Sequence, residues 1–75
     1  MQGSLTVKQA YSKIVPESIK TKIKGVKRAV YLNGTQMEPK DTLAQEGFGF
    51  GLVLLEVRDS DSNVLFFTYI EVEDD

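Results

Sequence analysis

The chain contains neither cysteine nor histidine. Without cysteine no disulfide can supplement the core, and without either residue the common structural zinc sites are excluded. Acid–base catalysis by histidine and nucleophilic catalysis by a thiol are excluded as well. The carboxylates follow apparent strand edges and turns, with no spacing that indicates an opposed catalytic pair. We therefore predict that the protein is not an enzyme and that it uses no cofactor and no metal.

Long apolar runs are also lacking. The longest ones, such as residues 52–55, are far too short to span a bilayer. The opening Met-Gln-Gly-Ser has neither the basic region nor the apolar stretch of a signal peptide. We expect no association with a membrane and a cytoplasmic location.

The composition that remains is ordinary for a folded protein. Of 75 residues, 41% are hydrophobic and 27% are charged, which predicts one small domain over residues 1–75 with an acidic tail at 73–75. The net charge of -2 conceals an asymmetry, because residues 1–40 hold eight basic and two acidic residues while residues 41–75 hold one basic and nine acidic residues. Such a division can mark a basic face for an acidic partner, or two halves that neutralise each other across one sheet. We favour the second interpretation.

The segment from about residue 5 to 15 has the pattern of a helix. Ser4 or Thr6 can serve as its N-cap, and Pro16 ends it by pushing Val15 out of the helical region. Its apolar face comprises Val7, Ala10, Tyr11 and Ile14.

The rest of the chain is dominated by strand patterns. Residues 18–24 alternate between apolar residues and lysines, which favours a strand with Lys20, Lys22 and Lys24 on one face. A second helix beginning at Pro16 is the competing interpretation. A strand over 26–32, with Val30 and Leu32 inward, precedes a turn at Asn33-Gly34.

Residues 35–46 form a predicted polar loop, which Met37 and Leu43 attach to the core. Strands over 52–57 and 64–72 follow, and they must be antiparallel because the six residues between them cannot make a parallel crossover. The predicted fold class is α+β, with one N-terminal helix packed on a small, mainly antiparallel sheet of three or four strands.

The stretch 47–51, Gly-Phe-Gly-Phe-Gly, allows three interpretations. A phosphate cradle requires a helix after the glycines, and a strand pattern follows instead. Residues 47–72 are similar to the carboxylate-binding loop and strand of PDZ domains, which implies capture of a peptide terminus, but the later helix of that family is lacking. We favour a tight bend in which Phe48 and Phe50 cover the core.

Residues 59–63, Asp-Ser-Asp-Ser-Asn, match the opening of an EF-hand calcium loop. The pattern then requires glycine and, later, glutamate, where this chain has Val64 and Ile70. A hairpin turn explains the stretch fully.

Residues 4–57 resemble the later part of a ubiquitin-like β-grasp domain. The resemblance rests on SLTVKQAYSKI for the helix, RAVYLNGTQMEPKDTL for the strand, turn and loop after it, and LVLLEV for the closing strand. The hairpin that opens that family does not precede the helix, an additional strand follows residue 57, and the diglycine tail is lacking. The resemblance implies a helix packed on a sheet that is used for protein binding.

Two functional hypotheses follow from these patterns. The first is a non-catalytic interaction module that forms a homodimer or accepts a partner strand at an exposed sheet edge. Its predicted contact residues are Phe48, Phe50, Leu65, Phe67 and Tyr69. The alternative is binding of an anionic ligand or, less favoured, a nucleic acid through a basic strand. Its predicted contact residues are Lys20, Lys22, Lys24, Lys27 and Arg28.

Overall fold

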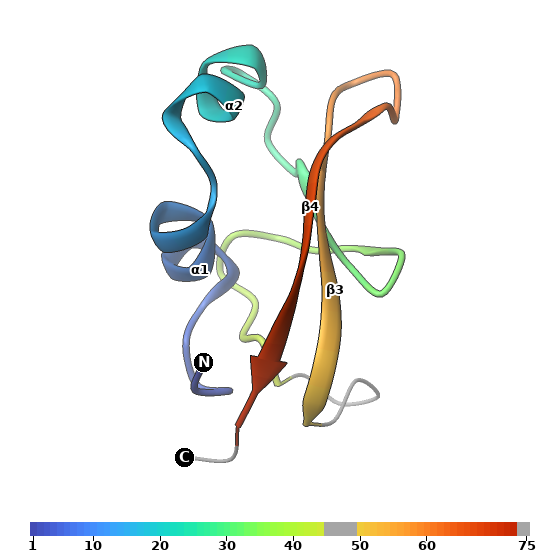
Figure 1. Cartoon of the computed structure of the whole chain (residues 1–75). Helices are drawn as coiled ribbons and strands as arrows, with labels where there is room; N and C mark the ends of the chain where they lie inside the picture. The colour runs from blue at the N-terminus through green and yellow to red at the C-terminus, as the bar shows by residue number, and fades with distance from the viewer. Residues whose placement is uncertain (45–49, 74–75) are drawn as a thin grey trace.

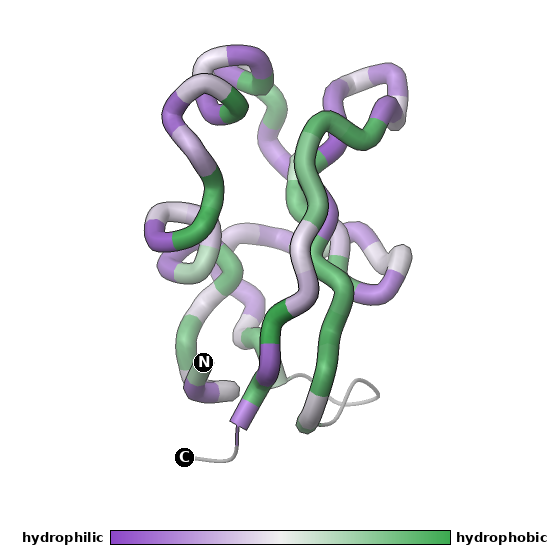
Figure 2. Tube along the Cα trace, in the orientation of Figure 1, coloured by the Kyte–Doolittle hydropathy of each residue, from purple (hydrophilic) through white to green (hydrophobic). Residues whose placement is uncertain are grey.

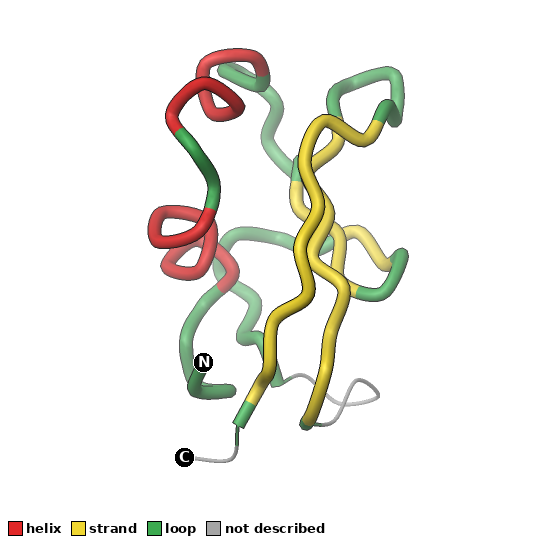
Figure 3. The backbone as a smooth tube through the Cα atoms, in the orientation of Figure 1, coloured by secondary structure: helices red, strands yellow, loops and turns green. Residues whose placement is uncertain are grey.

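The computed structural model describes residues 1–44 and 50–73 and has an α+β fold. Its elements are α1 (Val7–Ile14), α2 (Glu17–Lys22), β1 (Val30–Leu32), β2 (Thr35–Gln36), β3 (Gly51–Arg58) and β4 (Val64–Val72). The four strands form one antiparallel sheet in the order β2-β1-β3-β4. Both helices lie on one side of this sheet (Figures 1 and 3). The other side is called the outer face below.

The predicted first helix is confirmed. Thr6 is its N-cap and forms a capping box with Gln9. The Gln9 amide donates to the Thr6 hydroxyl at 3.2 Å, and the Thr6 amide donates to the Gln9 side-chain oxygen at 2.9 Å. Two amides of the first turn that have no partner within the helix are thereby satisfied. Val7 and Ala10 are buried against the sheet side of the molecule.

This cap gives a first testable result. The substitution Thr6→Ala removes the hydroxyl acceptor and should lower the free energy of unfolding by about 1 kcal/mol. Thr6→Ser keeps the acceptor and should retain most of that stability. Urea denaturation followed by circular dichroism measures both. Equal losses for alanine and serine would show that the Thr6 methyl group, rather than the cap, is what matters.

The strand predicted over residues 18–24 is wrong, because this segment begins with helix α2. Pro16 stands at the N-cap position with φ -62°, and Glu17 occupies the first turn, where a negative charge is favourable. Ile19 and Ile23 are four residues apart, so a helix brings both to the core side; Ile23 is buried and Ile19 is half-buried. The competing interpretation from Pro16 is therefore the one that the structure supports.

The strand predicted over residues 26–32 is shorter than expected, since β1 covers only Val30–Leu32. The turn at Asn33-Gly34 is confirmed, with φ of 50° and 84° at the two residues. Two consecutive positive φ values are what a tight two-residue hairpin needs. After it, the loop predicted over 35–46 begins as strand β2.

The core lies between the helices and the inner face of the sheet. Val30 and Leu32 are buried as predicted, and Met37 and Leu43 are buried as the predicted attachments of the loop. The hairpin of β3 and β4 forms the largest part of the sheet, and most residues of both strands are apolar (Figure 2). The buried side chains are Val7, Ala10, Val15, Ile23, Ala29, Val30, Leu32, Met37, Leu43, Val53, Leu55, Val57, Ile70 and Val72.

Candidate binding surfaces

Strand β4 is an edge of the sheet, and the first residues of the chain cover only one end of it. Gln2 makes a parallel bridge to Glu73. The Glu73 amide donates to the Met1 carbonyl at 2.7 Å, and the Gly3 amide donates to the Glu73 carbonyl at 2.9 Å. The N-terminal ammonium donates to the carbonyl of Glu71. The end of β4 near residues 71–73 is thereby paired.

These bonds also show which backbone groups face outward. Successive residues of a strand direct their N–H and C=O groups to alternate sides. Since Glu71 and Glu73 bond outward, the backbone groups of Phe67 and Tyr69 also lie on the outer edge, and those of Thr68 and Ile70 face β3. Among the described residues no strand pairs with this edge between Val64 and Ile70. A 3.5 Å contact from the Thr68 hydroxyl reaches the Tyr69 carbonyl.

The outer face next to this edge is apolar. The side chain of Leu52 is 70% exposed, that of Phe67 63% and that of Tyr69 60%. The strand register places Tyr69 opposite the half-buried Leu54, so these four side chains form one patch on β3 and β4. We call the free backbone edge from Val64 to Ile70, together with this patch, the β4 surface.

The structure separates the predicted contact residues of the first hypothesis. Phe67 and Tyr69 belong to the β4 surface. Phe50 is 56% exposed and lies beside Gly3, at the end of the sheet that the N-terminal residues cover. Leu65 is half-buried and packs against the core, so it is less accessible than Phe67 and Tyr69. Phe48 lies outside the described residues, as does most of the stretch 47–51 whose bend we predicted.

A polar cluster borders the patch on the side of β1. The Arg58 guanidinium bonds the Glu56 carboxylate at 2.9 Å and lies 4.2 Å from the centroid of the Tyr31 ring. Both charged side chains are largely shielded from water, at 24% and 14% exposed. The Nε atom of Arg58 is buried and has no hydrogen-bond partner among the described residues. The apolar part of the outer face is therefore confined to the half nearest β4.

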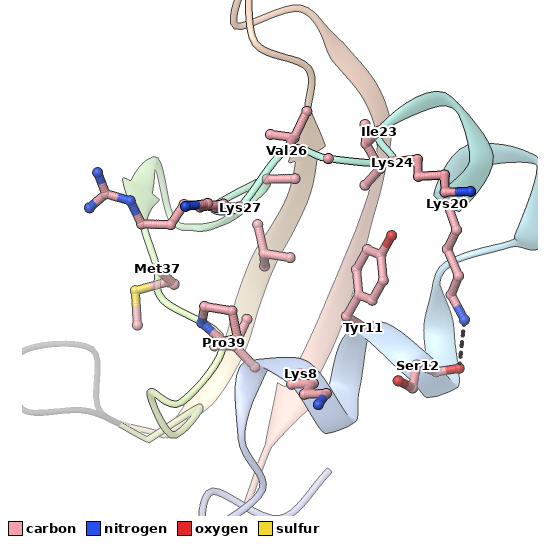
Figure 4. Close-up of a pocket in the computed structure, with 15 residues that line it drawn as sticks. Lys8, Tyr11, Ser12, Lys20, Ile23, Lys24, Val26, Lys27, Met37 and Pro39 are labelled. Atoms are coloured by element: carbon pink, nitrogen blue, oxygen red, sulfur yellow. Dashed lines mark hydrogen bonds between the residues drawn. The ribbon is translucent and has the colours of Figure 1, made fainter.

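A cavity of about 440 Å³ lies on the other side of the sheet, between α1, α2 and the segment that leads into β1 (Figure 4). We call it the basic pocket. Its apolar walls include Val7, Ile23, Val26 and Met37. Among the described residues, five cationic side chains and no carboxylate line it: Lys8, Lys20, Lys24, Lys27 and Arg28.

The basic pocket contains four of the five residues predicted for anion binding. The fifth, Lys22, does not line it. The helix explains why Lys22 is excluded, because it lies two residues after Lys20 in α2 and residues two apart on a helix do not face the same way. Lys24 lies beyond the C-cap residue Ile23, in the segment that leads into β1. The predicted basic strand is thus wrong, but Lys20, Lys24, Lys27 and Arg28 do come together.

Sequence reasoning missed Lys8 and Tyr11 as lining residues of this pocket. They are three apart on α1, and a helix brings such residues to one face. The signal was present in the sequence, but it indicates a shared site only once residues 17–22 are recognised as a second helix.

Tyr11 and Lys20 form a cation–π contact at the wall of the basic pocket. The Lys20 ammonium lies 5.4 Å from the centroid of the Tyr11 ring and donates to the Ser12 carbonyl at 3.2 Å and to the Glu17 carboxylate at 3.3 Å. Partial burial raises the pKa of the Tyr11 hydroxyl, and the nearby charge of Glu17 raises it further. Tyr11 is therefore a neutral hydrogen-bonding group at neutral pH.

The carboxylate of Asp59 accepts hydrogen bonds within its own turn. It accepts the amides of Asp61 and Asn63 at 2.9 Å each and the Asn63 side chain at 3.1 Å. The backbone and side-chain bonds from Asn63 lower the pKa of Asp59. Among the described residues no group of three acidic side chains is placed to hold a metal ion.

No protein-family model, curated protein or solved structure matches this chain at a significant level. Within residues 1–44 and 50–73 no helix is long and apolar enough to cross a membrane.

Proposed function

We propose that the protein is a non-catalytic interaction module that forms a homodimer by antiparallel pairing of two β4 edges. One observation carries the proposal: the outer edge of β4 between Val64 and Ile70 is unpaired by any described residue and bears no charged side chain. Natural edge strands are usually protected from such pairing by lysine, proline, bulges or a covering segment. Here the covering N-terminal residues stop at Glu71.

The geometry of the edge suits a second copy of the same chain. Two identical strands can pair antiparallel about a two-fold axis, so that the same surface serves on both sides. With the axis at Phe67, the outward N–H and C=O groups of Phe67 in one copy face those of Phe67 in the other. Tyr69 then lies opposite Leu65 of the second copy. The result is one continuous sheet of eight strands.

Side chains add to this pairing. Phe67 and Tyr69 direct their backbone outward and their rings to the outer face, so pairing brings the apolar patches of the two copies side by side. Cross-strand aromatic and aliphatic contacts of this kind contribute roughly 0.2–1 kcal/mol each. The uncharged sequence of the edge, VLFFTYI, introduces no like-charge repulsion between copies. Acidic side chains begin at Glu71, where the N-terminal residues already cover the edge.

Three further sequence-based predictions, on catalysis, family resemblance and location, are compatible with this proposal. Non-catalytic action is supported by the lack of histidine and cysteine. The resemblance of residues 4–57 to β-grasp domains favours the same kind of role, because it implies protein binding. The cytoplasm remains the proposed location.

The test is a lysine placed at the centre of the edge. Phe67→Lys should weaken self-association by more than about tenfold, because two lysines would meet across the two-fold axis and an exposed aromatic contact would be lost. Ser18→Lys adds the same charge at an exposed position of α2 and is the matched control. Sedimentation velocity over a range of protein concentrations measures association in all three proteins.

The outcomes are distinct. A dimer in the unsubstituted protein and in Ser18→Lys, with a monomer in Phe67→Lys, supports the proposal. A monomeric unsubstituted protein up to millimolar concentration contradicts self-pairing and directs attention to a strand from a different protein. A dimer that tolerates Phe67→Lys places the interface elsewhere.

A further inference from the structure

The basic pocket has features that self-association through β4 does not use. It lies on the helix side of the sheet, whereas the β4 surface comprises the outer face and the edge (Figures 1 and 4). Its volume of about 440 Å³ is large enough to admit a small organic molecule. An inference about its ligand is therefore independent of the proposed dimer.

The lining of the pocket combines two chemistries. Aliphatic and thioether side chains supply apolar walls that an apolar group can contact, and Tyr11 supplies an aromatic face. In Figure 4 the Tyr11 ring points toward Ile23, with Lys20 and Lys24 on one side of it and Lys27 on the other. A ligand that contacts the ring thus has ammonium groups on both sides of it.

The charge of the lining is strongly one-sided. Within residues 1–44 and 50–73, five cationic residues and no carboxylate line the cavity. Glu17 lies outside the lining and already pairs with Lys20 at 3.3 Å. Lysines gathered around a concave, partly apolar site repel one another and attract an anion, and the low-polarity walls strengthen that attraction.

From this we propose that the basic pocket binds a small organic anion, in which an aromatic or short acyl group carries a phosphate or carboxylate. The apolar group contacts Tyr11 and the aliphatic walls, and the anionic group is attracted by Lys24 and Lys27, which lie on opposite sides of the ring. A nucleic acid fits less well, because Tyr11 is the one aromatic residue in the described part of the lining and base stacking along a strand uses several aromatic rings.

The experiment is an NMR titration of the full chain, labelled with ¹⁵N, with three probes of similar size. Phenyl phosphate and benzoate carry a ring and an anionic group, and benzyl alcohol carries a ring alone. Both anions should shift the amide signals around Tyr11 and residues 23–29, and benzyl alcohol should bind more than about tenfold more weakly than the better anion. Which anion binds more tightly separates phosphate from carboxylate ligands.

Matched charge reversals test whether the anion binds in the basic pocket. Lys24→Glu and Lys27→Glu change two lining residues, and Lys22→Glu makes the same charge change on a neighbouring residue outside the lining. All three side chains belong to exposed residues, so the fold should survive, and circular dichroism verifies this. The dissociation constant for the better anion should rise more than about tenfold for the first two and much less for Lys22→Glu.

Several results would overturn the proposal. Equal weakening by Lys22→Glu and Lys24→Glu would show a diffuse effect of net charge rather than a pocket. Equal affinity for benzyl alcohol and the anions would show an apolar cavity without charge selection. A single-stranded oligonucleotide that binds more tightly and shifts signals well beyond the pocket would favour a nucleic-acid surface. The variant Phe67→Lys should bind the anion normally, so failure of the dimer leaves this result unaffected.

Discussion

Replacing Leu55 by alanine should lower the free energy of unfolding by about 2–5 kcal/mol. The Leu55 side chain is fully buried in β3, a central strand that pairs with β1 on one side and β4 on the other. Truncation removes apolar contacts and leaves a cavity that neighbouring side chains cannot fill completely. Small domains are stable by only about 5–15 kcal/mol, so a large part of the population should unfold at mild urea concentrations.

Leu52 provides the control for this substitution on the same strand. Its side chain is 70% exposed on the outer face, and Leu52→Ala should change stability by no more than about 0.5 kcal/mol. Urea denaturation of both variants, measured at low protein concentration to keep association out of the result, gives the comparison. Similar losses for Leu52→Ala and Leu55→Ala would contradict the assignment of the inner and outer faces.

Two proline substitutions in β4 should have opposite consequences. Thr68→Pro removes an amide that faces β3 and leaves the buried partner carbonyl of Leu55 unsatisfied, which costs about 1–3 kcal/mol in addition to steric strain. Tyr69→Pro removes an amide that faces the outer edge, where proline is tolerated. We expect Thr68→Pro to unfold the hairpin and Tyr69→Pro to leave a folded monomer.

The paired substitutions therefore separate stability from association. Circular dichroism reports folding, and sedimentation velocity reports the oligomeric state of each variant. If Tyr69→Pro unfolds the protein while Thr68→Pro does not, the alternation of backbone groups along β4 is opposite to the one described here. If Tyr69→Pro remains folded and still forms a dimer, the edge is not the interface.

The β-hairpin and the first helix were predictable from the sequence because local signals agree there. The first helix has a cap at Thr6 and helical spacing of its apolar residues, and both strands of the hairpin are apolar runs joined by a short polar turn. The turn at Asn33-Gly34 was predictable for the same reason, since both residues tolerate the positive φ that a two-residue hairpin turn requires.

A strand was favoured over helix α2 because the pattern of this segment fits two periods. Ile19 and Ile23 recur both at every second residue, with Thr21 between them, and at a spacing of four. In a segment this short, tertiary contacts decide, and burial of Ile23 beneath the helices favours the helix. Pro16 at the N-cap and Glu17 in the first turn are the local signals that favour the helix.

That error has a direct functional consequence. A strand would place Lys20, Lys22 and Lys24 on one face as a ladder, whereas the helix turns Lys22 away and brings Lys20 together with Lys8 and Tyr11 from α1. The chemistry of anion binding was thus visible in the composition of the segment. Its arrangement around a cavity depends on how two helices pack, which no local pattern specifies.

The β4 surface was predictable in part for a related reason. The apolar sequence VLFFTYI indicates a strand and a hydrophobic surface, but alternation alone does not say which residues face the core. The register with β3 puts Ile70 inside and Phe67 and Tyr69 outside, and the irregularity near Arg58 turns Leu65 toward the core. Residues 1–3 cover the end of β4 at Glu71 and Glu73. This contact joins the two ends of the chain, so no local sequence pattern predicts it.

The most direct test of the central claim is amide hydrogen exchange at Phe67 and Tyr69, measured by NMR at low micromolar and at millimolar protein concentration. Pairing of two β4 edges predicts that these two amides exchange rapidly in dilute solution and become protected as the concentration rises, while the Thr68 amide is protected at both concentrations. If Phe67 and Tyr69 exchange rapidly at both concentrations, the β4 edge is free in solution and the proposed dimer is contradicted.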